Sequence, residues 1–175
     1  PCEAHLALPD GTPLTVRQET RYPAEGQVRI VILPEREVET ILRFRIPAWS
    51  HHTVVRINGS PVQGTAAGTY LQVQKRWSPG DTVELDLDLS IRYWTGELNR
   101  RGQAALFRGP LLLAFDQKFN DLDTDDVPSF DLSHLAGTPV QANCQFQPLV
   151  LVGIRSADGR QVILCDFATA GAHGT

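Results

Sequence analysis

Hydrophobic and polar side chains alternate with a period of two residues along most of this 175-residue chain. The clearest case runs from Val83 to Ile91, where valine, leucine and isoleucine at odd positions alternate with glutamate, aspartate and serine at even positions. A strand directs successive side chains to opposite faces, whereas a helix would scatter these leucines around its axis. The pattern therefore predicts an antiparallel strand with one buried and one solvated face.

Shorter segments with the same alternation recur along the chain, separated by turn sequences. Asn58-Gly59 is a strong hairpin signal because both residues tolerate positive φ, and Ser78 to Asp81 form another turn signal. No stretch shows the periodicity of a long amphipathic helix. The chain is thus predicted to be all-β: an antiparallel β-sandwich of jelly-roll type, followed by a second, partial β region. The further predicted strands cover residues 14–18, 28–32, 42–46, 55–57, 71–77, 140–146, 149–154 and 162–167.

The segment from Leu111 to Phe115 is apolar at every position and lacks this alternation. Such a run predicts a strand that is buried on both faces, with one face toward its own sheet partner and the other under a neighbouring domain. Pro110 fits the start of this strand, where the missing N–H group is tolerated.

Residues 116–138 change character, because aspartates crowd a stretch that also contains proline and glycine. This composition predicts a loop or linker. We therefore expect a β-sandwich accessory domain over residues 1–117, an acidic linker over 118–138 and strands of a second, truncated β domain over 139–175. The alternative, in which residues 118–175 complete the first sandwich, stays open at this point.

The chain carries a net charge of −4 and has a pI near 5.7, which argues against a nucleic-acid partner because such a partner selects a basic face. No apolar run approaches the roughly 20 residues that a membrane-spanning helix needs. The sequence contains no methionine and opens without the basic and apolar regions of a signal peptide. We expect a piece of a longer polypeptide, whose compartment the sequence does not specify.

Residues that could carry chemistry are scattered. Cys2, Cys144 and Cys165 form no metal-binding spacing, and the latter two are expected to be buried thiols in apolar strands. His51 and His52 are adjacent, so an extended chain would point them apart and they would not share a metal ion.

Two groups of carboxylates are candidates for a site. The run from Asp121 to Asp126 would offer oxygens to calcium, but it lacks the glycine and the glutamate that an EF-hand loop requires, so a solvated linker is the preferred interpretation. Glu84, Asp86 and Asp88 follow one strand face with a spacing of about 6.5–7 Å, near the separation of glycosidase carboxylates. A solvated sheet face explains them better. We therefore predict no catalytic, cofactor-binding or metal-binding residue.

Exposed aromatic side chains are the remaining candidates. By parity Trp94 falls on the polar side of its strand with Arg92, and Trp49 follows a strand end. Such residues would stack on a sugar or pack against another domain. The predicted domain-contact or sugar-stacking residues are Trp49, Trp94, Leu111, Leu113 and Phe115.

An ordered set of short motifs resembles one known family. In this order and spacing, the set is similar to the region downstream of the catalytic barrel in glycoside hydrolase family 127, the β-L-arabinofuranosidase-like proteins. The resemblance covers about residues 14–117 and is weaker over 140–175. The motifs are Thr20-Arg21-Tyr22-Pro23, Leu42 to Trp49, Asn58-Gly59, Gly68-Thr69-Tyr70, Arg76-Trp77, Gly80-Asp81 and Arg108-Gly109-Pro110-Leu111.

The resemblance implies a parent protein with an (α/α)6 barrel followed by β-sandwich domains. It also implies a cysteine nucleophile, a zinc ion held by cysteines and a glutamate, and an acid/base glutamate, all in the barrel. No position here matches that motif. Cys2 has no neighbouring cysteine and lies upstream of the first predicted strand, so it is not interpreted as the nucleophile.

The chain is accordingly predicted to be a non-catalytic accessory β-sandwich of a glycosidase that acts on arabinofuranosides, with no cofactor of its own. Its expected partner is the catalytic barrel of the same parent chain, and a second copy of the chain or a carbohydrate are further candidates. Two alternatives are an autonomous carbohydrate-binding module and a structural or interaction domain of an unrelated parent. The sequence leaves open the parent's activity, its sugar and the oligomeric state.

Overall fold

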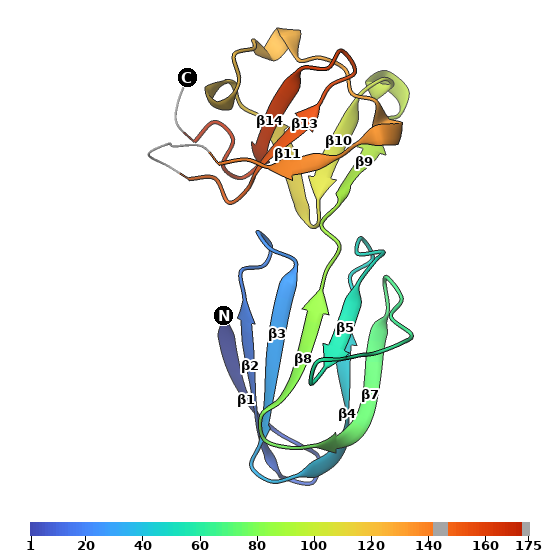
Figure 1. Ribbon diagram of the computed structural model, residues 1–175, viewed down its shortest axis with the longest axis vertical. Coiled ribbons are helices and arrows are strands. Elements are labelled where there is room, and N and C mark those ends of the chain that lie inside the picture. Colours follow the sequence, from blue (N-terminus) through green and yellow to red (C-terminus); the bar gives the residue numbers. More distant parts are fainter. Residues whose placement is uncertain (142–146, 173–175) are drawn as a thin grey trace. The chain divides into compact units, whose positions relative to one another are not determined.

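A computed structural model describes residues 1–141 and 147–172 and divides the chain into two compact units, Pro1–Leu89 and Ser90–Thr175. Both units consist of antiparallel strands joined by turns, and the described residues contain short 3-10 turns but no α-helix (Figure 1). The all-β prediction is therefore confirmed. Within the described ranges, no helix is long and apolar enough to cross a membrane.

The first unit is a two-layered sandwich. One layer is a six-stranded sheet in the order β1-β2-β3-β8-β5-β6, and the other is the antiparallel pair β4-β7 (Figure 1). The chain passes between the layers four times, from β3 to β4, from β4 to β5, from β6 to β7 and from β7 to β8, as expected for a sandwich of jelly-roll type. The strands are β1 (Cys2–Ala7), β2 (Pro13–Thr20), β3 (Gln27–Pro34), β4 (Val38–Arg45), β5 (Val54–Ile57), β6 (Ser60–Pro61), β7 (Tyr70–Trp77) and β8 (Asp81–Asp86).

The core of the first unit lies between these layers and is built from the inward positions of the alternating strands. Trp77 is fully buried, and its ring meets that of Phe44 at a centroid distance of 6.3 Å and an interplanar angle of 58°. Such a tilted contact suits the quadrupoles of two aromatic rings. The buried cluster comprises Leu14, Val28, Ile32, Val38, Phe44, Ile46, Val55, Leu71, Trp77, Val83 and Leu85.

The alternating run that begins at Val83 extends beyond the strand it predicts. β8 ends at Asp86, the Leu87 amide still donates to the Gly26 carbonyl at 3.0 Å, and Ile91 belongs to a strand of the second unit. Alternation marks which side chains prefer burial, whereas the strand ends where the neighbouring backbone stops offering partners. The single predicted strand is therefore replaced by two strands in two units.

The second unit is a six-stranded antiparallel sheet in the order β12-β13-β14-β11-β10-β9, in which β9 and β12 are the edges (Figure 1). One face of the sheet carries most of the buried side chains, including Leu106, Val152, Ile154 and Leu164. The strands are β9 (Ile91–Thr95), β10 (Ala104–Arg108), β11 (Leu111–Phe115), β12 (Gly137–Pro139), β13 (Leu151–Arg155) and β14 (Gln161–Asp166).

The strand pairing in this sheet places the boundary between the two units at a different position from the one expected from composition. β11 pairs with β14 and β10 pairs with β9, so residues 91–115 share one sheet with residues 137–166. The boundary lies between Leu89 and Ser90 and not after residue 117. Local composition marks a change of polarity, but it does not reveal which distant strands exchange hydrogen bonds.

The expected acidic linker, residues 118–138, lies within the second unit. It begins within the turn η2 (Gln117–Phe119) and includes η3 (Thr124–Asp126), η4 (Leu132–His134) and most of β12. A further turn, η1 (Leu98–Arg100), lies between β9 and β10. The strand expected over 149–154 is confirmed as β13, whereas most of the one expected over 140–146, with Cys144, lies outside the described residues.

Candidate functional site

The β9–β10 hairpin presents the most exposed aromatic side chain of the described residues. Trp94 is 71% exposed, and it lies on the edge strand directly opposite the small side chain of Ala105. Its neighbour Tyr93 is 47% exposed and points to the opposite face, where it pairs with the buried Leu106. Trp94 shares a face with Arg92, as parity predicts, but Tyr93 on the opposite face is exposed as well, so exposure does not distinguish the two faces of this edge strand.

A groove with a volume of about 500 Å³ lies beside Trp94 at the end of the hairpin. The loop that bounds it is closed by backbone hydrogen bonds from Gly96 N to Gln103 O at 2.8 Å and from Gln103 N to Arg100 O at 3.1 Å. A Cβ atom on Gly96 would lie 2.3 Å from the Arg100 carbonyl oxygen, so only glycine fits there. The lining residues are Trp94, Thr95, Gly96, Glu97, Arg100, Gln103, Ala104 and Ala105.

The polar side chains of the groove are exposed and complementary in charge. Arg100 Nη1 approaches Gln103 Oε1 at 3.5 Å, the outer limit of a hydrogen bond. Within the described part of the chain, neither Glu97 nor Arg100 belongs to an ion pair. The groove therefore combines one aromatic face with a carboxylate, a guanidinium and an amide, all able to bind polar groups of a ligand.

Trp49, the second predicted aromatic residue, lies in the first unit and is half-buried. Its ring stacks on Tyr22 with a centroid distance of 6.4 Å and an interplanar angle of 11°. Burial raises the pKa of the Tyr22 hydroxyl above its ordinary value. Tyr22 also borders a cavity of about 290 Å³, whose lining includes Ile30, Phe44 and Arg43. This aromatic corner is apolar, partly exposed and edged by positive charge.

The three predicted residues of β11 lie on one face of the second sheet. Leu113 is buried opposite Asp166, and Phe115 is half-buried opposite Leu164. Leu111 is half-buried and shares their face by parity. Leu113 is thus packed within its own unit. The structure places Leu111, Leu113 and Phe115 away from the groove lining beside Trp94 and in a different unit from Trp49.

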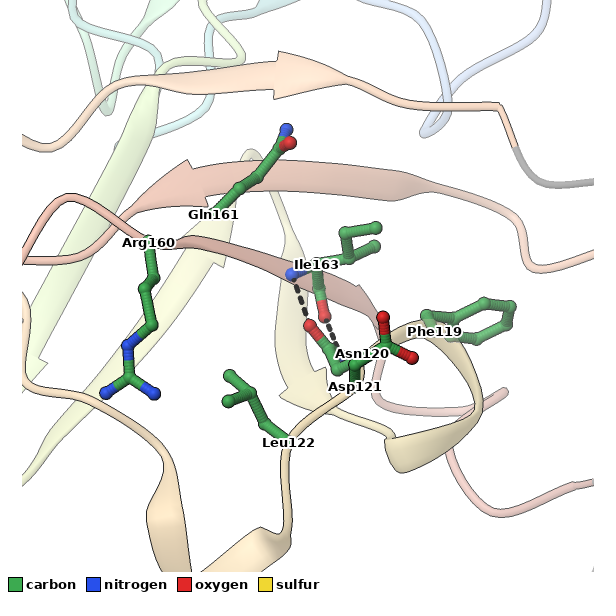
Figure 2. Close-up of a pocket in the computed structure, with 7 residues that line it drawn as sticks. All are labelled: Phe119, Asn120, Asp121, Leu122, Arg160, Gln161 and Ile163. Carbon is green, nitrogen blue, oxygen red and sulfur yellow. Dashed lines mark hydrogen bonds between the residues drawn. The ribbon is translucent and has the colours of Figure 1, made fainter.

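Another cavity in the second unit has a volume of about 410 Å³ and is lined by Phe119, Leu122, Arg160 and their neighbours. Figure 2 shows the Asn120 side chain turned toward the backbone of Ile163, with both hydrogen bonds drawn. Arg160 is held by Asp158 through Nε–Oδ2 at 2.8 Å, and this bond helps to keep the pKa of Asp158 well below its usual range. The polar groups here serve the fold, and sequence reasoning missed Asn120.

Two of the three strand carboxylates considered for a glycosidase site lie beside arginines. Asp86 forms an ion pair with Arg56, and Glu84 lies in register between Arg56 and Arg29 on the neighbouring strands. Carboxylates that alternate along one strand face and lie beside arginines on the neighbouring strands fit a solvated sheet face.

A local serine–histidine–aspartate cluster also falls short of a catalytic triad. In the η4 turn, Ser133 Oγ and Asp131 Oδ2 both lie 2.9 Å from the same His134 nitrogen, Nδ1. A triad needs one imidazole nitrogen for the nucleophile and the other for the carboxylate. The Ser133 hydroxyl and His134 lower the pKa of Asp131 to about 2, which marks a capped turn on the surface.

Among the described residues, no three histidine, cysteine or carboxylate side chains lie close enough together to bind a zinc ion. Cys165 is buried in β14, and burial, with help from Asp116 and Asp166, raises the pKa of its thiol to about 11. A buried thiol with this pKa is almost fully protonated at neutral pH and is therefore a poor nucleophile. Cys2 is exposed on the edge strand β1.

The chain resembles known proteins both in sequence and in fold. Residues 1–89 match the family described as β-L-arabinofuranosidase, GH127 middle domain. No curated protein matches the chain at a significant level. A solved structure named glycoside hydrolase superposes with a TM-score of 0.81 and 24% identity, over 99% of this chain and 32% of the other.

Two further solved structures show the same fold. A GH127 β-L-arabinofuranosidase from Geobacillus stearothermophilus T6 aligns with a TM-score of 0.74 and 22% identity, over 94% of this chain and 29% of the other. Another GH127 β-arabinofuranosidase aligns with a TM-score of 0.74 and 19% identity, over 94% of this chain and 30% of the other. The chain spans about a third of the length of these proteins.

Proposed function

The chain belongs to glycoside hydrolase family 127, and on that premise we propose that it is a non-catalytic accessory part of a β-L-arabinofuranosidase-like enzyme. Its role is to pack against the catalytic barrel of the parent protein and to support the barrel's loops. The observation that carries the proposal is the match of residues 1–89 to the middle domain of the family. The whole first unit is therefore a family module.

The chemistry of the described residues supports a non-catalytic role. The carboxylates Glu84 and Asp86 are matched by arginines, and the Cys165 thiol has a raised pKa. A glycosidase needs two carboxyl groups, or a thiolate and an acid, held in one cleft around the sugar. Zinc chemistry belongs, in this proposal, to the parent's barrel.

The corner formed by Tyr22 and Trp49 is the proposed contact with the barrel. A stacked aromatic pair that is only half-buried leaves apolar surface exposed, and such surface at the rim of a cavity is typical of an interface core. Arg43, on the rim, would supply the polar border. Leu113 is excluded from this surface because its own sheet already buries it.

The first test is enzymatic. The isolated chain is incubated with an aryl β-L-arabinofuranoside in the presence of zinc. It is expected to release no more of the corresponding phenol than the buffer control does. Turnover that follows the chain through successive purification steps would overturn the non-catalytic assignment.

The second test addresses the contact. Trp49→Ala in the parent enzyme is expected to lower the melting temperature or the activity of the barrel, while the same change in the isolated chain leaves its fold intact. Tyr70→Ala, which truncates a 59%-exposed aromatic residue of the same unit, is the matched control. Equal effects of both changes on the parent would contradict the assigned corner.

A further inference from the structure

We propose that the groove beside Trp94 binds a neutral sugar ring, which stacks on the exposed indole while the hairpin loop binds its hydroxyl groups. This site lies in the second unit, outside the residues that match the family's middle domain. It is independent of the proposed support of a barrel, because the groove is complete within one hairpin.

The indole offers a flat apolar surface of the right kind. Trp94 is 71% exposed on an edge strand, and its cross-strand neighbour Ala105 and the adjacent Ala104 are too small to cover the ring. A sugar ring presents a face of C–H groups to which an aromatic face is complementary, and tryptophan supplies the largest such face. The cavity of about 500 Å³ at this position lies within the size range of small-ligand sites.

The polar residues of the groove select a neutral polyol rather than an ion. Glu97 only accepts hydrogen bonds, Arg100 only donates them, and Gln103 does both. Neighbouring hydroxyl groups of a sugar each donate and accept, so they match this mixed set. Among the lining side chains, the charges of one carboxylate and one guanidinium balance, so the lining itself does not single out a phosphate or an ammonium group.

Backbone hydrogen bonds order the loop before a ligand arrives. The turn η1 is held by the bonds of Gly96 and Gln103 described above and by Arg100 N to Glu97 O at 2.9 Å. Gly96 allows the close approach of the Arg100 carbonyl. A loop that is ordered in advance loses less conformational freedom on binding, so a few hydrogen bonds and one stacked ring yield measurable affinity.

The experiment is an NMR titration of the isotope-labelled isolated chain with an arabinan-derived tetrasaccharide and, separately, with cellotetraose. We expect a saturable shift of the Trp94 indole N–H signal with at least one of the two neutral oligosaccharides. The signal of the fully buried Trp77, whose Nε1 donates to the Thr40 carbonyl at 3.1 Å, provides an internal reference.

Matched variants distinguish stacking on Trp94 from nonspecific binding to the hairpin. Trp94→Ala is expected to weaken binding by at least about tenfold, which corresponds to about 1.4 kcal/mol. Tyr93→Ala removes an exposed aromatic ring from the same strand but from the opposite face, and it should leave the affinity within about twofold. Gln103→Ala should weaken binding severalfold, because a hydroxyl group loses its partner.

Several results would overturn the inference. They are the absence of a saturable shift with both oligosaccharides at millimolar concentration, binding that Trp94→Ala leaves intact, or equal losses from Trp94→Ala and Tyr93→Ala. Each of these results leaves the accessory role untouched, because that role is tested by turnover and by the Trp49→Ala variant.

Discussion

The carboxamide of Asn120 hydrogen-bonds to both backbone groups of Ile163, donating from Nδ2 to the carbonyl oxygen and accepting at Oδ1 from the amide, each at 2.8 Å (Figure 2). The β11–β14 pairing covers Leu164 to Asp166, so the side chain continues this hydrogen bonding by one residue, as a strand residue would. A segment predicted from composition to be a linker is thereby hydrogen-bonded to strand β14 of the second unit.

We expect Asn120→Ala to destabilise the second unit by about 1–3 kcal/mol, because it leaves a partly buried donor and acceptor of Ile163 without partners. Urea denaturation measures the loss, and hydrogen exchange localises it, since the Ile163 amide should lose protection. Asn99→Ala, which truncates an exposed asparagine in η1, is the control and should have little effect. Unchanged Ile163 protection would contradict the assigned role.

Two tryptophans differ in what they contribute to stability. Trp77 is fully buried against Phe44 in the sandwich core, so Trp77→Ala should cost about 3–5 kcal/mol and lower the melting temperature sharply. Trp94→Ala at a position that is 71% exposed should change the free energy of unfolding by no more than about 0.5 kcal/mol. Thermal unfolding followed by circular dichroism compares the two variants, and similar losses in both would show that the assigned core is wrong.

The turn between β7 and β8 should make the first unit sensitive to acid. Burial opposes ionisation of Asp81, but hydrogen bonds from Lys75, the Ser78 amide and Asn58 outweigh it and lower the pKa of this carboxyl below 3.8. A carboxyl group whose pKa is lowered in the folded state stabilises the fold at pH values above the ordinary carboxyl pKa. This stabilisation is lost as the pH falls through the pKa of the folded state.

The corresponding variant is Asp81→Asn. At neutral pH it should be less stable than the wild type by about 1.5–3 kcal/mol, the range for hydrogen bonds to a charged group. The difference should shrink as the pH drops below about 3.8, where the carboxyl group becomes protonated in the unfolded chain and then in the folded chain. Denaturation at a series of pH values measures this difference in stability, with Asp125→Asn in the exposed η3 turn as the control. A difference that does not vary with pH would exclude the charge as its cause.

The cysteines should differ in reactivity. In a Cys144→Ser background, a thiol reagent at mildly alkaline pH should label the exposed Cys2 rapidly. Cys165 should react only after unfolding, because it is buried and because burial and nearby carboxylates raise the pKa of its thiol to about 11. Mass spectrometry of the labelled peptides distinguishes the two sites. Rapid labelling of Cys165 in the native protein would contradict its placement in β14.

Part of the candidate site was accessible to sequence reasoning. Parity placed Trp94 on the face of its strand opposite Tyr93, and the structure shows it there with its side chain 71% exposed. The groove itself was not predictable, because Glu97, Arg100 and Gln103 converge only through the backbone bonds of the loop. Asn120 carried no signal at all, since its partner Ile163 lies 43 residues away in the sequence.

The sequence by itself determined the class of fold, the inward positions of most strands and the family. These properties are local, because alternation with a period of two and short turn motifs are encoded within a few residues. Tertiary structure alone decided where one unit ends and the next begins, since the pairing of Leu113 with Asp166 joins strands that are distant in the chain. It also decided which polar side chains meet, because hydrogen bonds between distant segments depend on the register of whole sheets and not on composition.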